Sequence, residues 1–183
     1  MVTAVLLVLV LVVLVFFFVV GYNSLVKLRN KVENAWAQVQ VAVQRRHDLI
    51  PNLVETVKGY AAHEQEALTN VTEMRAKAMA AQRPGEKAEA EQQLGQALAN
   101  IQAVAEAYPD LKADRNFREL QQELAGTEDM IAAARRGYND AVKRYDIRRQ
   151  QIPWNIIAAM GTFGDYEYYE AGPEAQGPVE VSF

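Results

Sequence analysis

Hydrophobic positions divide the chain into two parts with different patterns. Residues 2–20 form an apolar run in which Thr3 is the single polar residue, and the run contains no charged residue, Gly or Pro. At about 1.5 Å per residue, a helix of this run is roughly 29 Å long, close to the roughly 30 Å hydrocarbon core of a bilayer. We therefore predict that residues 1–21 form a transmembrane helix.

A cleaved signal peptide is the alternative interpretation of this run. Signal peptides begin with basic residues, have an apolar stretch of about 7–15 residues and end in a small-x-small cleavage site. Here the start is neutral, the stretch is longer, and the exit carries Phe17, Phe18 and Tyr22. These features favour an anchor that is not removed.

The flanks of the run indicate its orientation. Lys27, Arg29 and Lys31 follow the run, whereas only Met1 precedes it. Basic residues beside a membrane span are enriched on the cytoplasmic side. This asymmetry predicts that the soluble part lies in the cytoplasm.

Past the anchor, apolar residues recur at spacings of three and four, and no stretch alternates like a strand. This period is typical of helices with one buried face. The most regular run follows Asp114, a residue type that suits an N-cap, and repeats like a coiled coil. We predict an all-α fold, with the transmembrane helix followed by an antiparallel up-and-down four-helix bundle over residues 22–151. Its long, coiled-coil-like helices are expected at 22–47, 48–81, 86–107 and 114–151.

The boundary near residues 45–51 has two interpretations. If Asp48 caps a new helix, Pro51 falls in its first turn, where the missing N–H costs nothing. The alternative is one kinked helix of about 60 residues with Pro51 inside it, at a cost of about 3 kcal/mol. The lower cost favours the hairpin.

Residues 152–183 form a third predicted part of the chain. Trp154 and Phe163 belong to an apolar, aromatic stretch that is too short to span a bilayer. In an up-and-down bundle this stretch returns to the membrane side, where it either contacts lipid or caps the end of the core. Tyr168, Tyr169 and Phe183 lie in a tail with Gly-Pro steps. The alternatives for this tail are an extended arm to a neighbouring subunit and a disordered terminus.

Charge and composition narrow the chemistry. The net charge is −4, which argues against nucleic acid as a partner, because phosphate binding needs a basic face. The absence of Cys excludes disulfides, thiol chemistry and thiolate metal sites. His63 begins a motif like that of zinc proteases, but Ala67 stands where the second His ligand would be. We expect no catalytic residue, no metal site and no cofactor.

Polar residues interrupt the helical pattern at three places. Glu64 lies within an apolar row, and Glu128 follows Thr127 in another, so either could fix the register of the helices. The third place is a charged run at the predicted turn, for which we expect a capping and ion-pair cluster: Arg45, Arg46, His47 and Asp48.

Several runs of residues resemble the LemA family and together cover nearly the whole chain. They include Tyr22-Asn23-Ser24-Leu25-Val26, Ala35-Trp36, Arg45-Arg46-His47-Asp48-Leu49-Ile50-Pro51-Asn52, Tyr108-Pro109-Asp110-Leu111, Pro153-Trp154-Asn155-Ile156-Ile157 and Pro178-Val179-Glu180-Val181-Ser182-Phe183. The resemblance implies a bacterial protein with an N-terminal membrane anchor, an antiparallel helical bundle and no established biochemical activity. It places the chain in the bacterial inner membrane as a single-pass protein.

These patterns lead to a functional hypothesis. We expect a non-enzymatic, membrane-anchored scaffold or adaptor whose partners are the lipid bilayer, further copies of itself and a possible membrane protein. The alternative is an accessory subunit of a membrane enzyme such as a protease, and a hydrolase using His47 and His63 is the least favoured interpretation. The candidate interaction or structural residues are Arg45, Arg46, His47, Asp48, Pro51, Trp154, Phe163, Tyr168, Tyr169 and Phe183.

Overall fold

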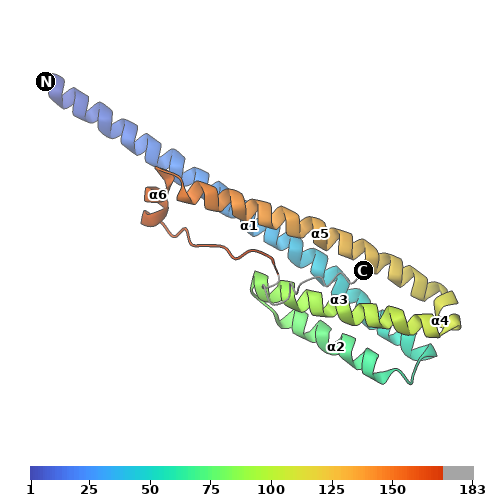
Figure 1. The fold of residues 1–183 in the computed structure, drawn as a ribbon. Helices are drawn as coiled ribbons and strands as arrows, with labels where there is room; N and C mark the ends of the chain where they lie inside the picture. Colours follow the sequence, from blue (N-terminus) through green and yellow to red (C-terminus); the bar gives the residue numbers. More distant parts are fainter. Residues whose placement is uncertain (171–183) are drawn as a thin grey trace, which may run out of the picture. The chain divides into compact units, whose positions relative to one another are not determined.

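A computed structural model describes residues 1–170, and every regular element among them is helical. The predicted all-α class is therefore confirmed, whereas the four-helix arrangement stays a prediction. In chain order the helices are α1 (Val2–Tyr60), α2 (Gln65–Ala80), α3 (Pro84–Ala107), α4 (Pro109–Ala113), α5 (Arg115–Gln150) and α6 (Trp154–Met160) (Figure 1).

The chain divides into two compact units. The anchor unit contains Met1–Ala37 and Gly137–Tyr166, and the core unit contains Gln38–Arg136 and, of the described C-terminal residues, Glu167–Glu170. Both α1 and α5 contribute residues to each unit.

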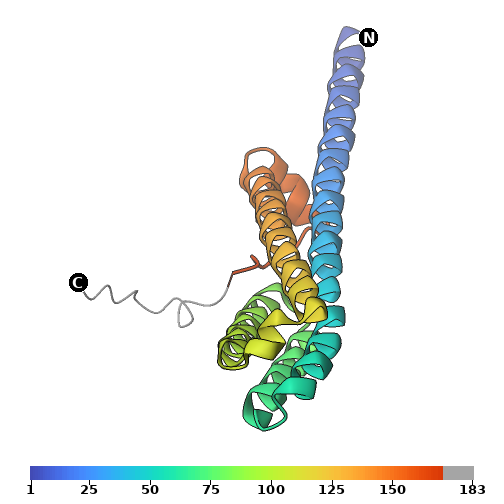
Figure 2. The same cartoon turned by 90° about the vertical axis from the view of Figure 1, so that its right-hand side faces the viewer.

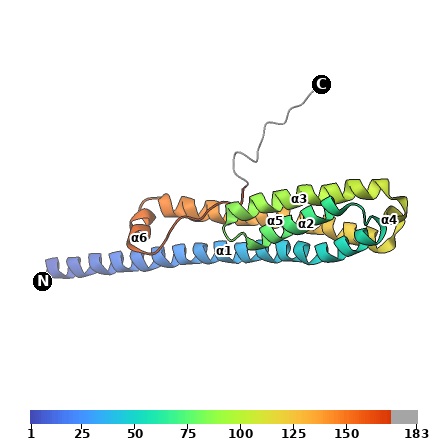
Figure 3. The ribbon, with the colours of Figure 1, turned by 90° about the horizontal axis from the view of Figure 1, so that it is seen from below.

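The first helix does not stop where the hairpin prediction placed its end. α1 runs without a break from Val2 to Tyr60, with Pro51 inside it (Figure 3). The predicted helices 22–47 and 48–81, and the turn between them, are therefore wrong. Asp48 accepts a hydrogen bond from Gln44 Nε2 one turn earlier, at 2.7 Å, instead of capping a new helix.

Arg75 explains how α1 accommodates its proline. Pro51 has no N–H, so it cannot bond the carbonyl of His47 four residues earlier. Arg75 Nε, from α2, donates to that carbonyl at 2.8 Å. This bond from a neighbouring helix satisfies the acceptor that the proline leaves without its helical donor, which offsets part of the cost of an internal proline.

The remaining helix boundaries lie near the predicted ones. α3 begins at Pro84, where the lack of an N–H costs nothing, and the short helix α4 was not predicted. α5 begins directly after Asp114, whose Oδ1 accepts a hydrogen bond from the backbone N–H of Phe117 at 2.9 Å. The predicted N-cap is therefore confirmed. The same hydrogen bond lowers the pKa of the Asp114 carboxyl group.

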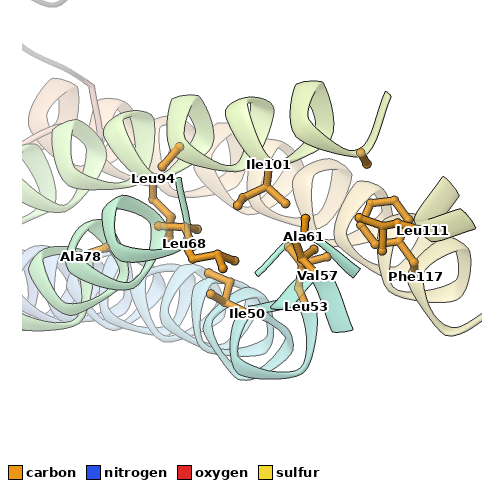
Figure 4. Packing of buried hydrophobic residues seen from close by; sticks show 13 residues of the cluster. Ile50, Leu53, Val57, Ala61, Leu68, Ala78, Leu94, Ile101, Leu111 and Phe117 are labelled. Atoms are coloured by element: carbon orange, nitrogen blue, oxygen red, sulfur yellow. The ribbon is translucent and has the colours of Figure 1, made fainter. Parts of the chain in front are cut away.

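The hydrophobic core of the core unit is built by all of its helices. α2 and α3 lie side by side in each view (Figures 1, 2 and 3). Side chains from α1, α2 and α3, among them Ile50, Leu68 and Leu94, are directed toward one another (Figure 4). Phe117 of α5 and Leu111 of α4 belong to the same cluster and are nearly or fully buried. The helical period read from the sequence thus identifies the buried face.

The anchor unit contains the apolar run. Part of α1 is long and apolar enough to cross a membrane, with a mean hydropathy of 3.5 over 18 residues. The large hydrophobic side chains of this run are exposed, which contrasts with the buried Leu25 and Val32 further along the same helix. The apolar run therefore lacks the covering that a core helix of a soluble protein has.

Candidate functional site

The core unit buries a group of charged side chains. Arg46, His47 and Glu91 are 6%, 1% and 5% exposed, which is rare for residues with ionisable side chains. Their contacts join α1, which carries Arg46 and His47, to Glu91 of α3 and to Glu128 of α5. We call these four residues the charged centre.

Glu91 is shared by two partners within the charged centre. Its Oε1 lies 2.6 Å from His47 Nε2, and its Oε2 lies 3.6 Å from Arg46 Nη1. Arg46 Nη2 in turn donates to Glu128 Oε1 at 3.1 Å, and the Glu128 side chain is exposed. A buried guanidinium is tolerated when carboxylates pair with it. Losing either Glu91 or Glu128 would therefore leave the buried charge of Arg46 less well compensated.

Small neighbours make room for Arg46. A Cβ atom added at Gly95 of α3 would lie 3.4 Å from Arg46 Nη2, which is an ordinary van der Waals distance. An alanine would therefore touch the guanidinium, and a longer side chain would compete with it for the same space. Gly95, which the sequence shows as an isolated glycine, therefore has a packing role next to the charged centre.

A cavity of about 340 Å³ opens beside the charged centre. Arg46, Glu91 and Glu128 line it together with Arg135 of α5 and Tyr169 of the C-terminal segment. Among the described residues, Arg46 Nε and Glu91 Oε2 have no hydrogen-bond partner. Both atoms are buried, so the polar lining of the cavity includes one cationic and one anionic side chain that are only partly hydrogen-bonded.

Tyr169 closes one side of this cavity. Its side chain is 3% exposed, although the residues on both sides of it are exposed. Burial raises the pKa of the Tyr169 hydroxyl, and the negative charge of Glu91 raises it further. The phenol is therefore neutral at physiological pH, and an uncharged ring lines the cavity beside Arg46 and Glu91.

The structure separates the charged run that the sequence analysis treated as one cluster. Arg46 and His47 lie in the charged centre, whereas Arg45, Asp48 and Pro51 are exposed. The expected cap does not form, because α1 continues through this segment. The buried pair instead connects α1 to its neighbours.

Glu91 and Arg75 are two residues of this region that the sequence analysis missed. Glu91 lies three residues before Leu94, so it occupies a position on the apolar row of α3. A charged residue on an apolar row indicates a buried polar group, and the same criterion identified Glu64 in the sequence. Glu64 itself accepts a hydrogen bond from Tyr108 Oη at 2.9 Å, which raises the pKa of the tyrosine.

The anchor unit contains a second group of candidate residues. The Trp154 ring of α6 stacks on Phe17, with ring centroids 5.2 Å apart. The Phe163 and Tyr22 rings pack in a T-shaped arrangement, with ring centroids 5.3 Å apart. We call these four residues the aromatic cluster. A Cβ atom at Gly21 would collide with Trp154 and Ile157, so glycine lets α6 approach α1. The predicted residues Trp154 and Phe163 are thus brought together around the exit of the apolar run.

Basic side chains lie over two of these rings. The Arg148 guanidinium is 5.1 Å from the Trp154 ring centroid, and the Arg29 guanidinium is 5.8 Å from that of Phe163. Both distances are within the range of cation–π attraction. The aromatic cluster therefore combines apolar surface with positive charge.

One side of the α6 region is exposed and apolar. Ile152, Ile156 and Met160 are 83%, 59% and 73% exposed, whereas Ile157 and Ala158 are buried. Tyr168, another candidate residue, is exposed on the C-terminal segment. Phe183 lies outside the described residues.

The two histidines of the chain lie in different surroundings. His47 is buried and bonded to Glu91, and His63 is exposed near the turn between α1 and α2. No group of three or more His, Asp or Glu side chains in the described part of the chain could hold a metal ion. The ion pairs of the charged centre link α1, α3 and α5. The cavity beside them has polar side chains that suit a polar ligand.

Comparisons with known proteins identify relatives of this chain. The model of the family described as LemA family matches residues 35–183. The magnetosome protein MamQ 2 of Paramagnetospirillum magneticum is 26% identical over 184 residues, which cover 86% of this chain and 68% of that protein. Protein LemA of Metamycoplasma hominis is 30% identical over 171 residues, which cover 92% of this chain and 78% of that protein.

Proposed function

Because this chain belongs to the LemA family, we propose that it is a membrane-anchored helical scaffold that associates with further copies of itself. The observation that carries the proposal is the exposed apolar run of residues 2–20, which continues without a break into the helix that lines the core unit. In the isolated chain this apolar surface would contact water. Inserting the run into a bilayer transfers the surface from water to lipid, which is favourable.

The aromatic cluster supports a second contact with the bilayer. Trp154 packs where the apolar run ends, and the exposed Ile152, Ile156 and Met160 extend the apolar surface next to it. Tryptophan with aliphatic neighbours favours the interface between hydrocarbon and headgroups, and nearby arginines favour anionic lipids. We propose that α6 lies in this interface.

The proposed compartment is the cytoplasmic side of a bacterial inner membrane. Lys27, Arg29 and Lys31 follow the apolar run closely, which is the arrangement that the positive-inside rule associates with the cytoplasm. Both named relatives come from bacteria.

A non-enzymatic role fits the charged centre. Glu91 bonds His47 and pairs with Arg46, so the buried ionisable groups hold helices together through one another. Such networks are used to fix a unique packing of helices. We propose that the charged centre gives the core unit one defined surface on which partners assemble.

Light scattering in a mild detergent tests the scaffold directly. We expect the protein mass per particle to rise from 20.5 kDa to a multiple of it as the concentration passes through the micromolar range. A monomer at every concentration would remove self-association from the proposal. Crosslinking in cells from sites beside Arg46 and Trp154 gives an independent measurement. Adducts with one membrane enzyme, instead of with further copies, would replace the scaffold by an accessory subunit.

A further inference from the structure

The C-terminal segment Glu167–Glu170 lies on the core unit and has no helix or strand of its own. The Glu167 carboxylate lies against Gly85 in the first turn of α3, where any Cβ atom would collide with it. Its charge also reaches Arg83, whose pKa it helps to raise, after the larger effect of Glu86. Two residues later, Tyr169 is buried in the cavity beside the charged centre.

The surface that receives this segment is complementary to it. Its walls are apolar at Ala88, Ile131 and Ala132, and it presents the guanidinium groups of Arg46 and Arg135. The segment brings two tyrosines between two acidic residues, in the order Glu167, Tyr168, Tyr169, Glu170, and Tyr169 is the buried one. We call this surface the tyrosine groove. An extended segment with one buried aromatic anchor is a common form of peptide recognition.

The connection before the segment is suited to exchange. Residues 163–168 have no regular secondary structure, and Gly164 has open space around its Cα. A second copy offers the same segment, so exchange would re-form the same contacts between chains at little cost in interaction energy. A membrane anchor on each copy holds the chains in one plane and raises their effective concentration.

We propose that the tyrosine groove of one copy receives the Glu167–Glu170 segment of a second copy, with Tyr169 as its anchor. Reciprocal exchange fills both grooves, so the assembly closes as a two-fold dimer. The inference rests on the self-association in the proposed function and names the contact that produces it. The segment seated in its own groove is the same contact made within one chain.

Cysteine crosslinking tests this contact without background, because the chain has no Cys. One tagged copy carries Glu170→Cys and a second copy, with a different tag, carries Ala132→Cys in the groove. Both are reconstituted in the same vesicles and treated with a short bismaleimide. We expect an adduct that contains both tags. A copy with both substitutions measures the contact within one chain.

Matched variants separate the contact from general proximity. Adding Tyr169→Ala to the Glu170→Cys copy should reduce the mixed adduct roughly tenfold, because it removes the buried anchor. Tyr168→Ala, at the exposed neighbouring position, should leave the adduct within about a factor of two, as expected for a residue outside a hot spot. Circular dichroism of each variant shows whether its helices are intact. Lys58→Cys, exposed elsewhere on the core unit, should give no mixed adduct with Glu170→Cys.

Each outcome decides the inference. A mixed adduct that depends on Tyr169 supports it. Adducts confined to the chain with both substitutions, or no adduct at all, overturn it. Light scattering on the same samples distinguishes this failure from failure of the scaffold: particles larger than a monomer without a mixed adduct would leave self-association standing, and monomers would remove both.

Discussion

Replacing Glu91 by Leu should lower the free energy of unfolding by about 3–5 kcal/mol, the usual cost of removing one member of a buried ion pair. The change takes the partner from His47 Nε2 and leaves the buried Arg46 with the exposed Glu128 alone. Urea unfolding of the full chain in detergent micelles, followed by circular dichroism at 222 nm, measures the loss.

Two further variants show that the cost comes from buried charge. Glu89→Leu changes an exposed residue on the same helix and should shift the stability by no more than about 0.5 kcal/mol. Combining Glu91→Leu with Arg46→Met should recover part of the loss, because an apolar pair of similar size replaces the ion pair. If Glu91→Leu were as mild as Glu89→Leu, the charged centre would have no role in stability.

Gly21→Ala should displace α6 from α1 or destabilise the anchor unit by about 1–3 kcal/mol, the usual cost of overpacking. The new methyl group would overlap the side chains of Trp154 and Ile157. The stacking of Trp154 on Phe17 depends on the same approach. Trp154 fluorescence in a Trp36→Phe background reports the displacement as a change in emission maximum.

Gly59→Ala is the matched control on the same helix. A Cβ atom there has no neighbour within 4 Å, so the substitution should stabilise α1 slightly, by about 0.5–1 kcal/mol, through helix propensity alone. Its effect on Trp154 emission should be nil. Equal behaviour of Gly21→Ala and Gly59→Ala would show that α6 does not pack closely on the end of the apolar run.

Local patterns were enough to predict much of the helical structure. The spacing of apolar residues marks the buried faces of α2, α3 and α5, because packing against one core imposes the helical period on the sequence. Asp114 was recognisable as an N-cap, since its bond to Phe117 spans only three residues. The family resemblance is confirmed by the match over residues 35–183.

Interactions between distant residues account for the prediction that failed. Pro51 favoured a helix end when only its neighbours were considered, but Arg75 of α2 satisfies the carbonyl that the proline leaves free. That contact joins residues 28 positions apart, and no local pattern reveals it.

Only part of the candidate site was predicted, because its other residues are distant in the sequence. Arg46 and His47 were identified by their charge, yet their partners Glu91 and Glu128 lie on other helices. Tyr169 was identified as an aromatic residue in the tail, and only the fold places it beside the charged centre. A sequence pattern shows which residues are unusual, whereas their assembly depends on tertiary packing.

The depth of Trp154 in a bilayer tests the central claim, that residues 2–20 lie in the membrane with α6 at its surface. Trp36 and Trp154 are the two tryptophans of the chain, so Trp36→Phe and Trp154→Phe each leave one reporter. Trp36 lies roughly 24 Å along α1 beyond residue 20, at about 1.5 Å per residue. In vesicles containing lipids with brominated acyl chains, we expect strong quenching of Trp154 and little quenching of Trp36. Trp154 emission as insensitive to these lipids as that of Trp36 would contradict the account.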